Sequence, residues 1–172
     1  LREWLNTDFY NTAFSKTQQG RIKELTRENK STYNSKYDNN PTSDKITLLS
    51  YDDVLNTSYG FSSSSSTNDT ARQRKGTDYA KCQGLYVSSS YGGTFWWRLR
   101  SPYYSGSAAG VGTDGWADDG YYYYCGVYLT GRGVVPALNL TKSEISTSSI
   151  TSGEFAADEL TDENAPKTSQ AA

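Results

Sequence analysis

The chain has 172 residues and a formal net charge of -2, a length that suits one domain or one domain followed by a tail. This balance supplies no broad basic surface for nucleic acid or anionic lipid, and no apolar run is long enough to cross a bilayer. Because the sequence starts at Leu1 and contains no Met, we expect it to be part of a longer protein, and its compartment stays open.

The first 44 residues predict two helices and a polar stretch. Leu1, Trp4 and Leu5 share one helical face, which predicts a helix over residues 1–14. The further expectations are a break of that helix at Asn6–Asp8, a second helix over residues 16–25, and a polar stretch over residues 26–44 with a turn at Asn39–Pro41.

The middle of the chain predicts short elements separated by loops. The expected strands cover residues 45–50, 85–87, 94–99 and 133–140, the expected helical segments cover residues 51–55 and 77–83, and a serine run at residues 62–66 is the expected loop. Tyr79 and Ala80 should face inward from their helix. Pro136 implies a sheet edge or a strand start. Helices first, then short irregular strands around a glycine-rich insertion, favour an α+β domain.

Regular patterning stops between Tyr103 and Gly133. Eight of the 15 glycines and seven of the 15 tyrosines lie there, and Cys125–Leu129 alternates as a short strand would. Lys, Glu and Gln make up 21 of the 172 residues, so the 32 residues from Tyr103 to Val134 should contain about four, yet they contain none. Tyr with Ser and Gly is also the composition of antibody paratopes. We therefore interpret the segment as a contact surface; the alternative is a tyrosine-rich sheet whose rings cover neighbouring strands.

The residue types that could carry catalysis are few. The chain has no His, which excludes a Ser–His or Cys–His nucleophile and makes a zinc site unexpected. Carboxylates cluster at Asp52–Asp53 and Asp118–Asp119, with Asp114 nearby, and we interpret them as turn residues. Calcium at the later cluster is the alternative, although the spacing of a dedicated calcium loop is missing. We expect no cofactor, no metal, and free thiols at Cys82 and Cys125.

Two motifs carry a resemblance to a known family: FWWRLRSP at residues 95–102 and GVVPALNL at residues 133–140. Weaker marks accompany them in order, namely Trp4-Leu5-Asn6, Phe9-Tyr10, Ala13-Phe14, Leu48-Leu49-Ser50 and Thr77-Asp78-Tyr79-Ala80. Together they resemble an uncharacterised bacterial and phage domain family with a WWLRSP signature and a GVRPALNL ending. Its members resemble C-type lectin-fold variable proteins of diversity-generating retroelements, which are related in fold to formylglycine-generating enzymes. Arg98 is an insertion in the first motif, and Val135 replaces the usual Arg of the second.

The resemblance implies a C-type lectin-like domain over residues 1–140, with a variable region at about residues 96–140. Independently of the resemblance, residues 141–172 are rich in Ser, Thr, Ala, Glu and Asp, and we expect them to form a polar peripheral extension or a partly disordered tail. Retroelements of this kind mutate template adenines, so AAC or AAT codons yield Tyr, Ser, Gly, Asp and others but never Lys, Glu, Gln, Met or Trp. Of residues 103–132, only Trp116 departs from that set.

Under this reading the segment divides into a fixed framework and a ligand-contacting set. The framework would be Trp96, Trp97, Leu99, Pro102, Ala109, Val111, Val127, Val134, Pro136, Ala137 and Leu138, with core packing favoured over ligand stacking for both tryptophans. The ligand-contacting residues would be Tyr103, Tyr104, Ser105, Ser107, Gly110, Gly112, Asp118, Asp119, Tyr121, Tyr122, Tyr123, Tyr124, Tyr128 and Arg132.

The resulting functional expectation is a monomeric, non-enzymatic ligand-binding protein with a massively diversified surface. Its ligand would be a protein or glycan on a cell or host surface, and its location a cell surface or virion. No nucleic acid and no direct membrane contact are expected for this segment. Two alternatives stay open: an invariant glycan-binding or adhesion module, and an enzyme of the formylglycine-generating type. The enzyme is disfavoured because no closely spaced cysteine motif is present.

Overall fold

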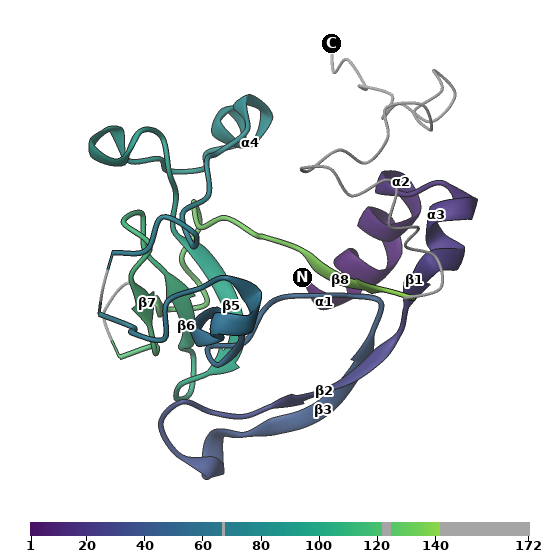
Figure 1. Cartoon of the computed structure of the whole chain (residues 1–172), viewed down its shortest axis with the longest axis horizontal. Coiled ribbons are helices and arrows are strands. Elements are labelled where there is room, and N and C mark those ends of the chain that lie inside the picture. The colour runs from purple at the N-terminus through teal and green to yellow at the C-terminus, as the bar shows by residue number, and fades with distance from the viewer. Residues whose placement is uncertain (67, 122–124, 142–172) are drawn as a thin grey trace. The chain divides into compact units, whose positions relative to one another are not determined.

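A computed structural model describes residues 1–66, 68–121 and 125–141 of the chain. It confirms a mixed α+β protein that opens with helices and contains several small antiparallel sheets (Figure 1). The chain divides into two compact units. Unit 1 holds Leu1–Leu25, Ser43–Thr47 and the described residues from Leu138 on, and unit 2 holds Thr26–Thr42 and Leu48–Ala137.

Unit 1 begins with the predicted helix, which the structure continues through its expected break. It runs as α1 (Arg2–Trp4), a π-helical turn η1 (Leu5–Phe9) and α2 (Tyr10–Ala13). The wider turn lets Asn6 face β4 (Ile46–Thr47): its amide Nδ2 donates to the Ile46 carbonyl at 2.8 Å, and its Oδ1 accepts from the Ile46 amide at 3.0 Å. Asn6, one of the residues from which we predicted a break, therefore bonds the helix to β4.

The second predicted helix is shorter than expected. α3 (Lys16–Arg21) starts at a capping box between Ser15 and Gln18 and ends before Ile22. Ile22 is buried in β1 (Ile22–Lys23), which pairs antiparallel with β8 (Ala137–Leu140), and β8 in turn adjoins β4. Pairing with β8 thus overrides the helical spacing of these residues.

A polar hairpin occupies the stretch that the sequence described only as polar. It consists of β2 (Leu25–Asn29) and β3 (Asn39–Asp44), with a 3-10 turn η2 (Ser35–Tyr37) at its tip. Asn29 is buried, and its Nδ2 donates to the Asn40 carbonyl at 2.8 Å. The strands carry little apolar alternation, so the periodicity that reveals most strands is missing here.

Unit 2 is built on the sheet β5 (Trp97–Pro102), β6 (Ala108–Val111) and β7 (Ala117–Asp118). β5 and β6 pair antiparallel with Trp97 opposite Val111, and both of these side chains are almost fully buried. Apolar side chains from the sheet and its neighbours form one core cluster: Val54, Phe95, Trp97, Leu99, Ala109, Val111 and Ala117. The strand expected at residues 94–99 is therefore present but shifted toward Pro102.

The remaining elements of unit 2 are short turns: η3 (Asp53–Leu55), η4 (Thr57–Tyr59), α4 (Asp78–Cys82) and η5 (Ser89–Tyr91). The helical turn expected at residues 51–55 and the helix expected at residues 77–83 are confirmed. The inward position predicted for Tyr79 is wrong, because this side chain is 76% exposed. No helix among the described residues is long and apolar enough to cross a membrane.

Two strand predictions are wrong and one is too long. Residues 85–87 form no strand, and Cys125–Leu129 forms turns in which only Gly126 makes an isolated bridge, to Ser107. The strand predicted from Gly133 begins at Ala137, directly after Pro136, as the missing N–H of proline allows.

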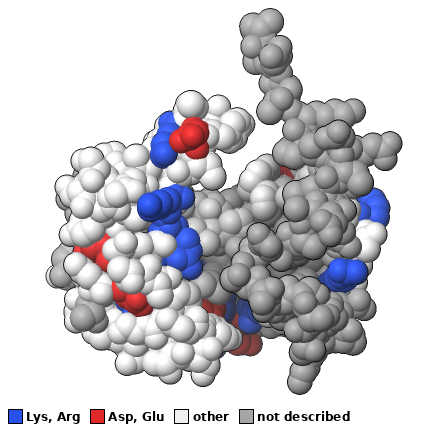
Figure 2. Space-filling view, turned by 45° about the horizontal axis from the view of Figure 1, so that its top comes forward, with Lys and Arg blue, Asp and Glu red and all other residues white. Residues whose placement is uncertain are grey.

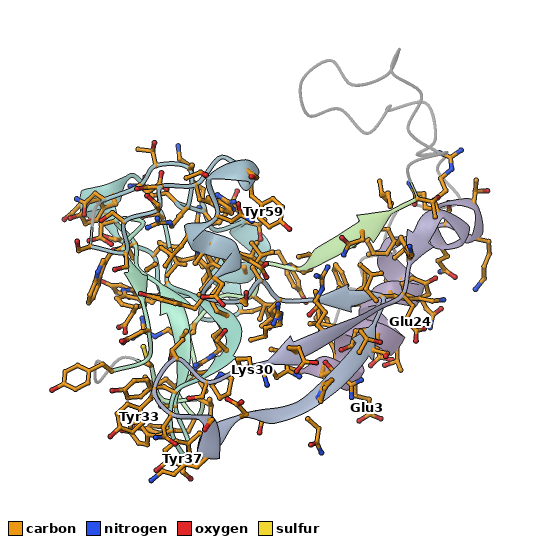
Figure 3. All side chains as sticks on the ribbon, turned by 60° about the horizontal axis from the view of Figure 1, so that its bottom comes forward. Glu3, Glu24, Lys30, Tyr33, Tyr37 and Tyr59 are labelled. Carbon is orange, nitrogen blue, oxygen red and sulfur yellow. The ribbon has the colours of Figure 1, made fainter. Side chains whose placement is uncertain are left out.

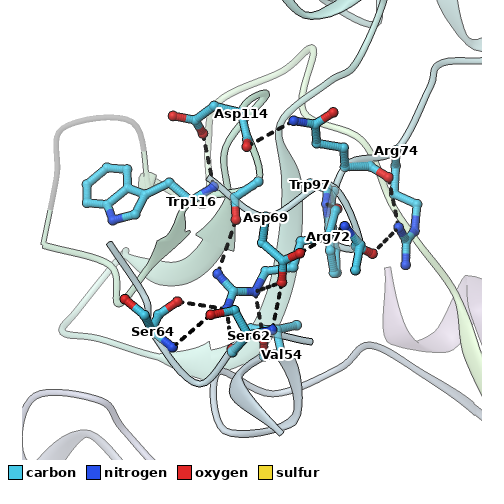
Figure 4. A network of polar contacts seen from close by, with 12 residues as sticks. Val54, Ser62, Ser64, Asp69, Arg72, Arg74, Trp97, Asp114 and Trp116 are labelled. Carbon is cyan, nitrogen blue, oxygen red and sulfur yellow. Dashed lines mark hydrogen bonds and ion pairs between the residues drawn. The ribbon is translucent and has the colours of Figure 1, made fainter. Parts of the chain in front are cut away.

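A buried arginine organises the loops around the core of unit 2 (Figure 4). Arg72 is fully buried, and its guanidinium donates to the carbonyls of Val54, Ser62, Ser64 and Gly115. Its Nε also lies 3.3 Å from an Asp69 carboxylate oxygen. Five acceptors therefore satisfy a charge that would otherwise be costly to bury.

We predict that Arg72→Met destabilises the protein by about 3–5 kcal/mol, because it leaves buried carbonyls and the Asp69 carboxylate without their donor. Urea unfolding measures this free energy. Lys75→Met is the matched control, since Lys75 is exposed and surface changes stay within about 0.5 kcal/mol. Equal losses in the two variants would contradict a central role for Arg72.

Candidate binding surface

The tip of the polar hairpin is fixed to the end of β5 by hydrogen bonds. The Thr32 amide donates to the Pro102 carbonyl at 3.0 Å, and the Ser31 hydroxyl donates to the Tyr103 carbonyl at 2.8 Å. The Thr32 hydroxyl also donates to the Asp119 carbonyl. Residues more than 60 positions apart in the sequence are thereby held together within unit 2.

Five tyrosines gather where the hairpin tip meets the end of β5 and the segment after β7. We call them the tyrosine surface: Tyr33, Tyr37, Tyr103, Tyr104 and Tyr121. Ring centroids lie 5.0 Å apart between Tyr33 and Tyr103, and 6.1 Å apart between Tyr33 and Tyr37, which stack. Tyr104 and Tyr121 each meet Tyr103 edge-on, at 5.3 and 6.2 Å. Figure 3 shows Tyr33 and Tyr37 close together at the turn of the hairpin.

Tyr103 is the buried centre of this cluster and the others surround it. Tyr103 is 8% exposed, whereas Tyr33 is 60%, Tyr104 48% and Tyr121 68% exposed. Burial raises the pKa of the Tyr103 phenol, and the nearby Asp119 carboxylate raises it further. A buried ring that supports exposed ones gives a rigid amphipathic surface.

Gly120 allows the chain to pass close behind Tyr103. Its φ of 110° is in the region that favours glycine, and a Cβ there would lie 2.4 Å from the Cβ of Tyr103. The Ser107 hydroxyl donates to the Gly120 carbonyl at 2.9 Å and fixes this turn. The turn delivers Tyr121 to the edge of the Tyr103 ring.

Charged groups of both signs border the tyrosine surface on the hairpin. The ammonium of Lys36 lies 4.8 Å from the ring centroid of Tyr37, within cation–π range. Asp38 accepts from the Ser31 amide at 2.7 Å, and Lys30 lies 3.4 Å from its carboxylate. These contacts lower the pKa of Asp38, the backbone hydrogen bond most of all. A partner would meet phenol rings bordered by ionic groups.

The structure divides the predicted ligand-contacting residues into three groups. The first is exposed or partly exposed: Tyr104, Ser105, Asp119, Tyr121, Tyr128 and Arg132. The second is buried: Tyr103, Ser107, Gly110, Gly112 and Asp118. The third, Tyr122, Tyr123 and Tyr124, lies outside the described residues. A buried side chain cannot touch a partner without rearrangement, so the second group is better described as support.

Packing explains why these members are buried. A Cβ on Gly110 would lie 3.1 Å from the Trp97 carbonyl, and one on Gly112 would lie 3.3 Å from Cζ2 of Trp96. Asp118 is fully buried in β7, where its carboxylate accepts from the Gly120 amide at 2.9 Å. Among the framework residues, Trp97 is in the core as expected. Val127 is not, because it is 55% exposed.

Sequence reasoning missed Tyr33 and Tyr37. Both lie in the stretch read only as polar, and neither belongs to the glycine-rich segment. The available signal was two tyrosines four positions apart in a stretch that holds no other aromatic residue. Their contact with Tyr103 depends on the hairpin, which the residue pattern does not reveal.

A polar cleft of about 600 Å³ lies beside β5, between the hairpin and the turn before η3. Its central guanidinium, Arg100, donates to the Glu28 carbonyl at 2.6 Å and to the Asp53 carboxylate at 3.1 Å. Burial lowers the pKa of Arg100, while Asp53 opposes that shift. Because its terminal nitrogens already serve internal acceptors, this cleft is better explained as structural support for the hairpin.

Neither cysteine belongs to a disulfide or a metal-binding cluster among the described residues. Burial raises the pKa of the Cys125 thiol far above neutrality, and Asp118 adds to the shift, so the reactive thiolate is suppressed. Cys82 is exposed, and both cysteines are free, as predicted. Within the described ranges, no group of three or more His, Cys, Asp or Glu side chains could hold a metal ion.

Figure 2 shows that much of one face of the molecule is white, with charged side chains in a few small groups. By sequence, residues 103–134 are also poor in charge, since their charged residues are three Asp and one Arg. Such a segment offers rings, hydroxyls and backbone groups rather than charges to its surroundings.

We predict that the hairpin tip loosens in acid through Asp38. Its pKa is below the ordinary 3.8, so its contribution is complete above that pH and is lost as the pH falls through the lowered value. The chemical shift of the Ser31 amide proton, followed from pH 6 to pH 2, should therefore titrate in the wild type. In Asp38→Asn it should stay flat, and the same acid titration in both proteins would refute the assignment.

Comparison with known families matches residues 1–142 to a family described as a domain of unknown function (DUF6273). No curated protein and no solved structure matches the chain. The matched stretch holds both units, the tyrosine surface and both signature motifs. The chain therefore belongs to the DUF6273 family, a family of unknown function.

Proposed function

We propose that the protein is a non-catalytic ligand-binding protein that uses the tyrosine surface, with its loop segment diversified by a retroelement. The observation that carries this proposal is the cluster of exposed phenol rings on a buried tyrosine support. Tyr104 and Tyr121 come from the segment without Lys, Glu or Gln, and both are exposed at its edge. Exposed rings beside small polar residues favour recognition over solubility.

The proposed fold is C-type lectin-like. Support comes from the pairing of β1 with β8, the first and last strands among the described residues: Ile22 lies opposite Leu140, and the loop-rich unit 2 lies between them in the sequence. Such closure gives long irregular loops a fixed start and end. Loops on a rigid scaffold are the usual carriers of binding residues.

An invariant glycan-binding module is the second candidate, and the stacked pair Tyr33–Tyr37 favours it. These two rings lie outside the glycine-rich segment, so they would not vary with it. Aromatic faces of this kind can stack on sugars. Catalysis is not proposed, because Cys125 is a suppressed thiol and Cys82 is not paired with it.

We expect the neighbouring DNA to contain a reverse-transcriptase gene and a near-copy of the codons for residues 96–140. Comparison of the locus among sibling strains should show differences concentrated between Tyr103 and Arg132. Sequencing of these loci is the measurement. Differences spread evenly along the gene, with no second copy of the segment, would remove the diversification and leave the invariant module.

Stability measurements separate a binding surface from a sheet of packed rings. Tyr104→Ser and Tyr121→Ser should each change the free energy of unfolding by about 0.5 kcal/mol or less, because these rings are exposed. Tyr103→Ser should cost about 3 kcal/mol or more, since it empties the centre of the cluster. If all three variants lose the same stability, the rings serve packing and the proposal fails.

A further inference from the structure

Four rings of the tyrosine surface follow one another in contact, from Tyr37 through Tyr33 and Tyr103 to Tyr104. Successive ring centroids lie 6.1, 5.0 and 5.3 Å apart. Tyr33 and Tyr104 are largely exposed and Tyr37 is partly exposed, while the buried Tyr103 lies between them and fixes their spacing. This row offers ring surface over the length of several residues, which suits a ligand of extended shape.

The backbone groups at the centre of the row are already paired, which disfavours recognition by strand addition. The Pro102 carbonyl accepts from the Thr32 amide at 3.0 Å, and the Tyr103 carbonyl accepts from the Ser31 hydroxyl at 2.8 Å. The Tyr103 amide donates to the Ser107 carbonyl at 3.0 Å. A peptide that adds as a strand needs open N–H and C=O groups along an edge, and internal bonds occupy them here. Contact with a partner must therefore come from the side chains.

The ionic groups beside the row also have partners within the protein. Lys30 lies 3.4 Å from the Asp38 carboxylate, and the ammonium of Lys36 lies 4.8 Å from the ring centroid of Tyr37. The Asp119 carboxylate accepts from the backbone amide two residues later at 2.9 Å. A charged ligand would have to compete with these contacts. Charge complementarity therefore favours an uncharged ligand.

The phenol hydroxyls are left to bind a ligand by hydrogen bonds. Within the described part of the chain, the hydroxyls of Tyr33, Tyr37 and Tyr104 form no hydrogen bond. Each can donate one. A polyproline II helix has no internal hydrogen bonds, so its carbonyl groups are open acceptors, whereas those of an α-helix are already used. Hydroxyl donors on exposed rings thus match the backbone of a polyproline II segment.

A proline-rich segment also fits the rings better than a glycan does. The pyrrolidine ring is apolar and packs on an aromatic face, and the polyproline II conformation is formed before binding, which lowers the entropy cost. A glycan presents hydroxyls that must donate as well as accept. The carboxylates beside the row, Asp38 and Asp119, already accept from backbone amides at 2.7 and 2.9 Å.

We infer that the tyrosine surface binds a proline-rich segment of a partner protein in the polyproline II conformation. Its pyrrolidine rings would lie on Tyr33 and Tyr104, and its carbonyl groups would accept from the phenol hydroxyls. This inference rests on the proposed function, because it assigns a ligand class to the same surface. Tyr33 and Tyr37 lie outside the glycine-rich segment, so they supply the part of the contact that stays constant while the loop varies.

Isothermal titration calorimetry of the full chain with decaproline, a Gly-Ser decapeptide and cellohexaose tests the inference. A polyproline II helix rises about 3.1 Å per residue, so a decapeptide is long enough to span the row. Decaproline should bind at least about tenfold more tightly than the other two probes, because it alone is preorganised and matches rings and donors together.

Equal binding of the two peptides would overturn the polyproline II conformation as the feature recognised. Failure of decaproline to bind at about 1 mM would overturn the inference altogether. Tighter binding of cellohexaose would overturn it in favour of a glycan and leave the surface as a binding site. The proposed function is judged separately, by the sequenced loci and by the stability of the tyrosine variants.

Tyr33→Ala should weaken decaproline binding at least about tenfold, and Tyr33→Phe should weaken it less, because the ring remains and only the hydroxyl is lost. Tyr59→Ala is the matched control and should leave binding unchanged. Tyr59 is 59% exposed, close to the 60% of Tyr33, and Figure 3 shows it well away from Tyr33 and Tyr37 in the same unit.

Tyr104→Ser tests the row from the side of β5, in case Tyr33→Ala loosens the hairpin tip. It should weaken decaproline binding several-fold, because it removes both a ring and a phenol donor. Wild-type affinity for decaproline in Tyr33→Phe and Tyr104→Ser would refute the assignment of the ligand to these rings.

Discussion

The buried Arg72 guanidinium is the interaction on which the rest of unit 2 depends. It joins the η3 turn at Val54, the serine-rich loop and the β6–β7 turn at Gly115 to one charge. The backbone carbonyl of Arg72 accepts a hydrogen bond from the indole N–H of Trp97 at 3.0 Å. Arg72 therefore connects the surrounding loops to the core. A unit with such short strands has few ladder hydrogen bonds to hold its loops, and a multivalent donor can replace many of them.

The tyrosine surface is likewise held by individual contacts rather than by a long strand ladder. The hairpin tip meets the sheet through hydrogen bonds from the Ser31 hydroxyl and from the amide and hydroxyl of Thr32, and through the packing of Tyr33 on Tyr103. Each contact is modest, but together they fix one face of the tip. This arrangement leaves Tyr104 and Tyr121 on the surface while Tyr103 is buried beneath them. One buried tyrosine thus supports exposed tyrosines from two segments, the β5–β6 turn and the stretch after β7.

The sequence predicted what local spacing and composition can express. Three features could be predicted from the sequence alone: the helical face that includes Leu5, the burial of Trp97 and the unusual residue composition after Tyr103. The sequence pattern could not predict which strands pair when they lie far apart in the chain. Ile22 has helical spacing but forms a strand, because its partner Leu140 lies more than 100 residues away. The strands of the hairpin that carries Tyr33 have little apolar alternation, so the sequence pattern does not predict them.

Burial also limits which positions of the glycine-rich segment can vary. The restricted alphabet covers buried and exposed sites alike, yet their tolerance differs. At Gly112 any larger residue would press against Trp96 and Asp114, and at Gly120 against Tyr103. Tyr104 and Tyr121 contact Tyr103 at their ring edges but are largely exposed, so substitutions there displace less of the packing. A diversified segment can therefore keep its fold only if its variable codons fall on the exposed sites, with glycine fixed where the chain passes close to a ring. Composition alone marks the segment, whereas the packing decides which of its residues are available to a partner.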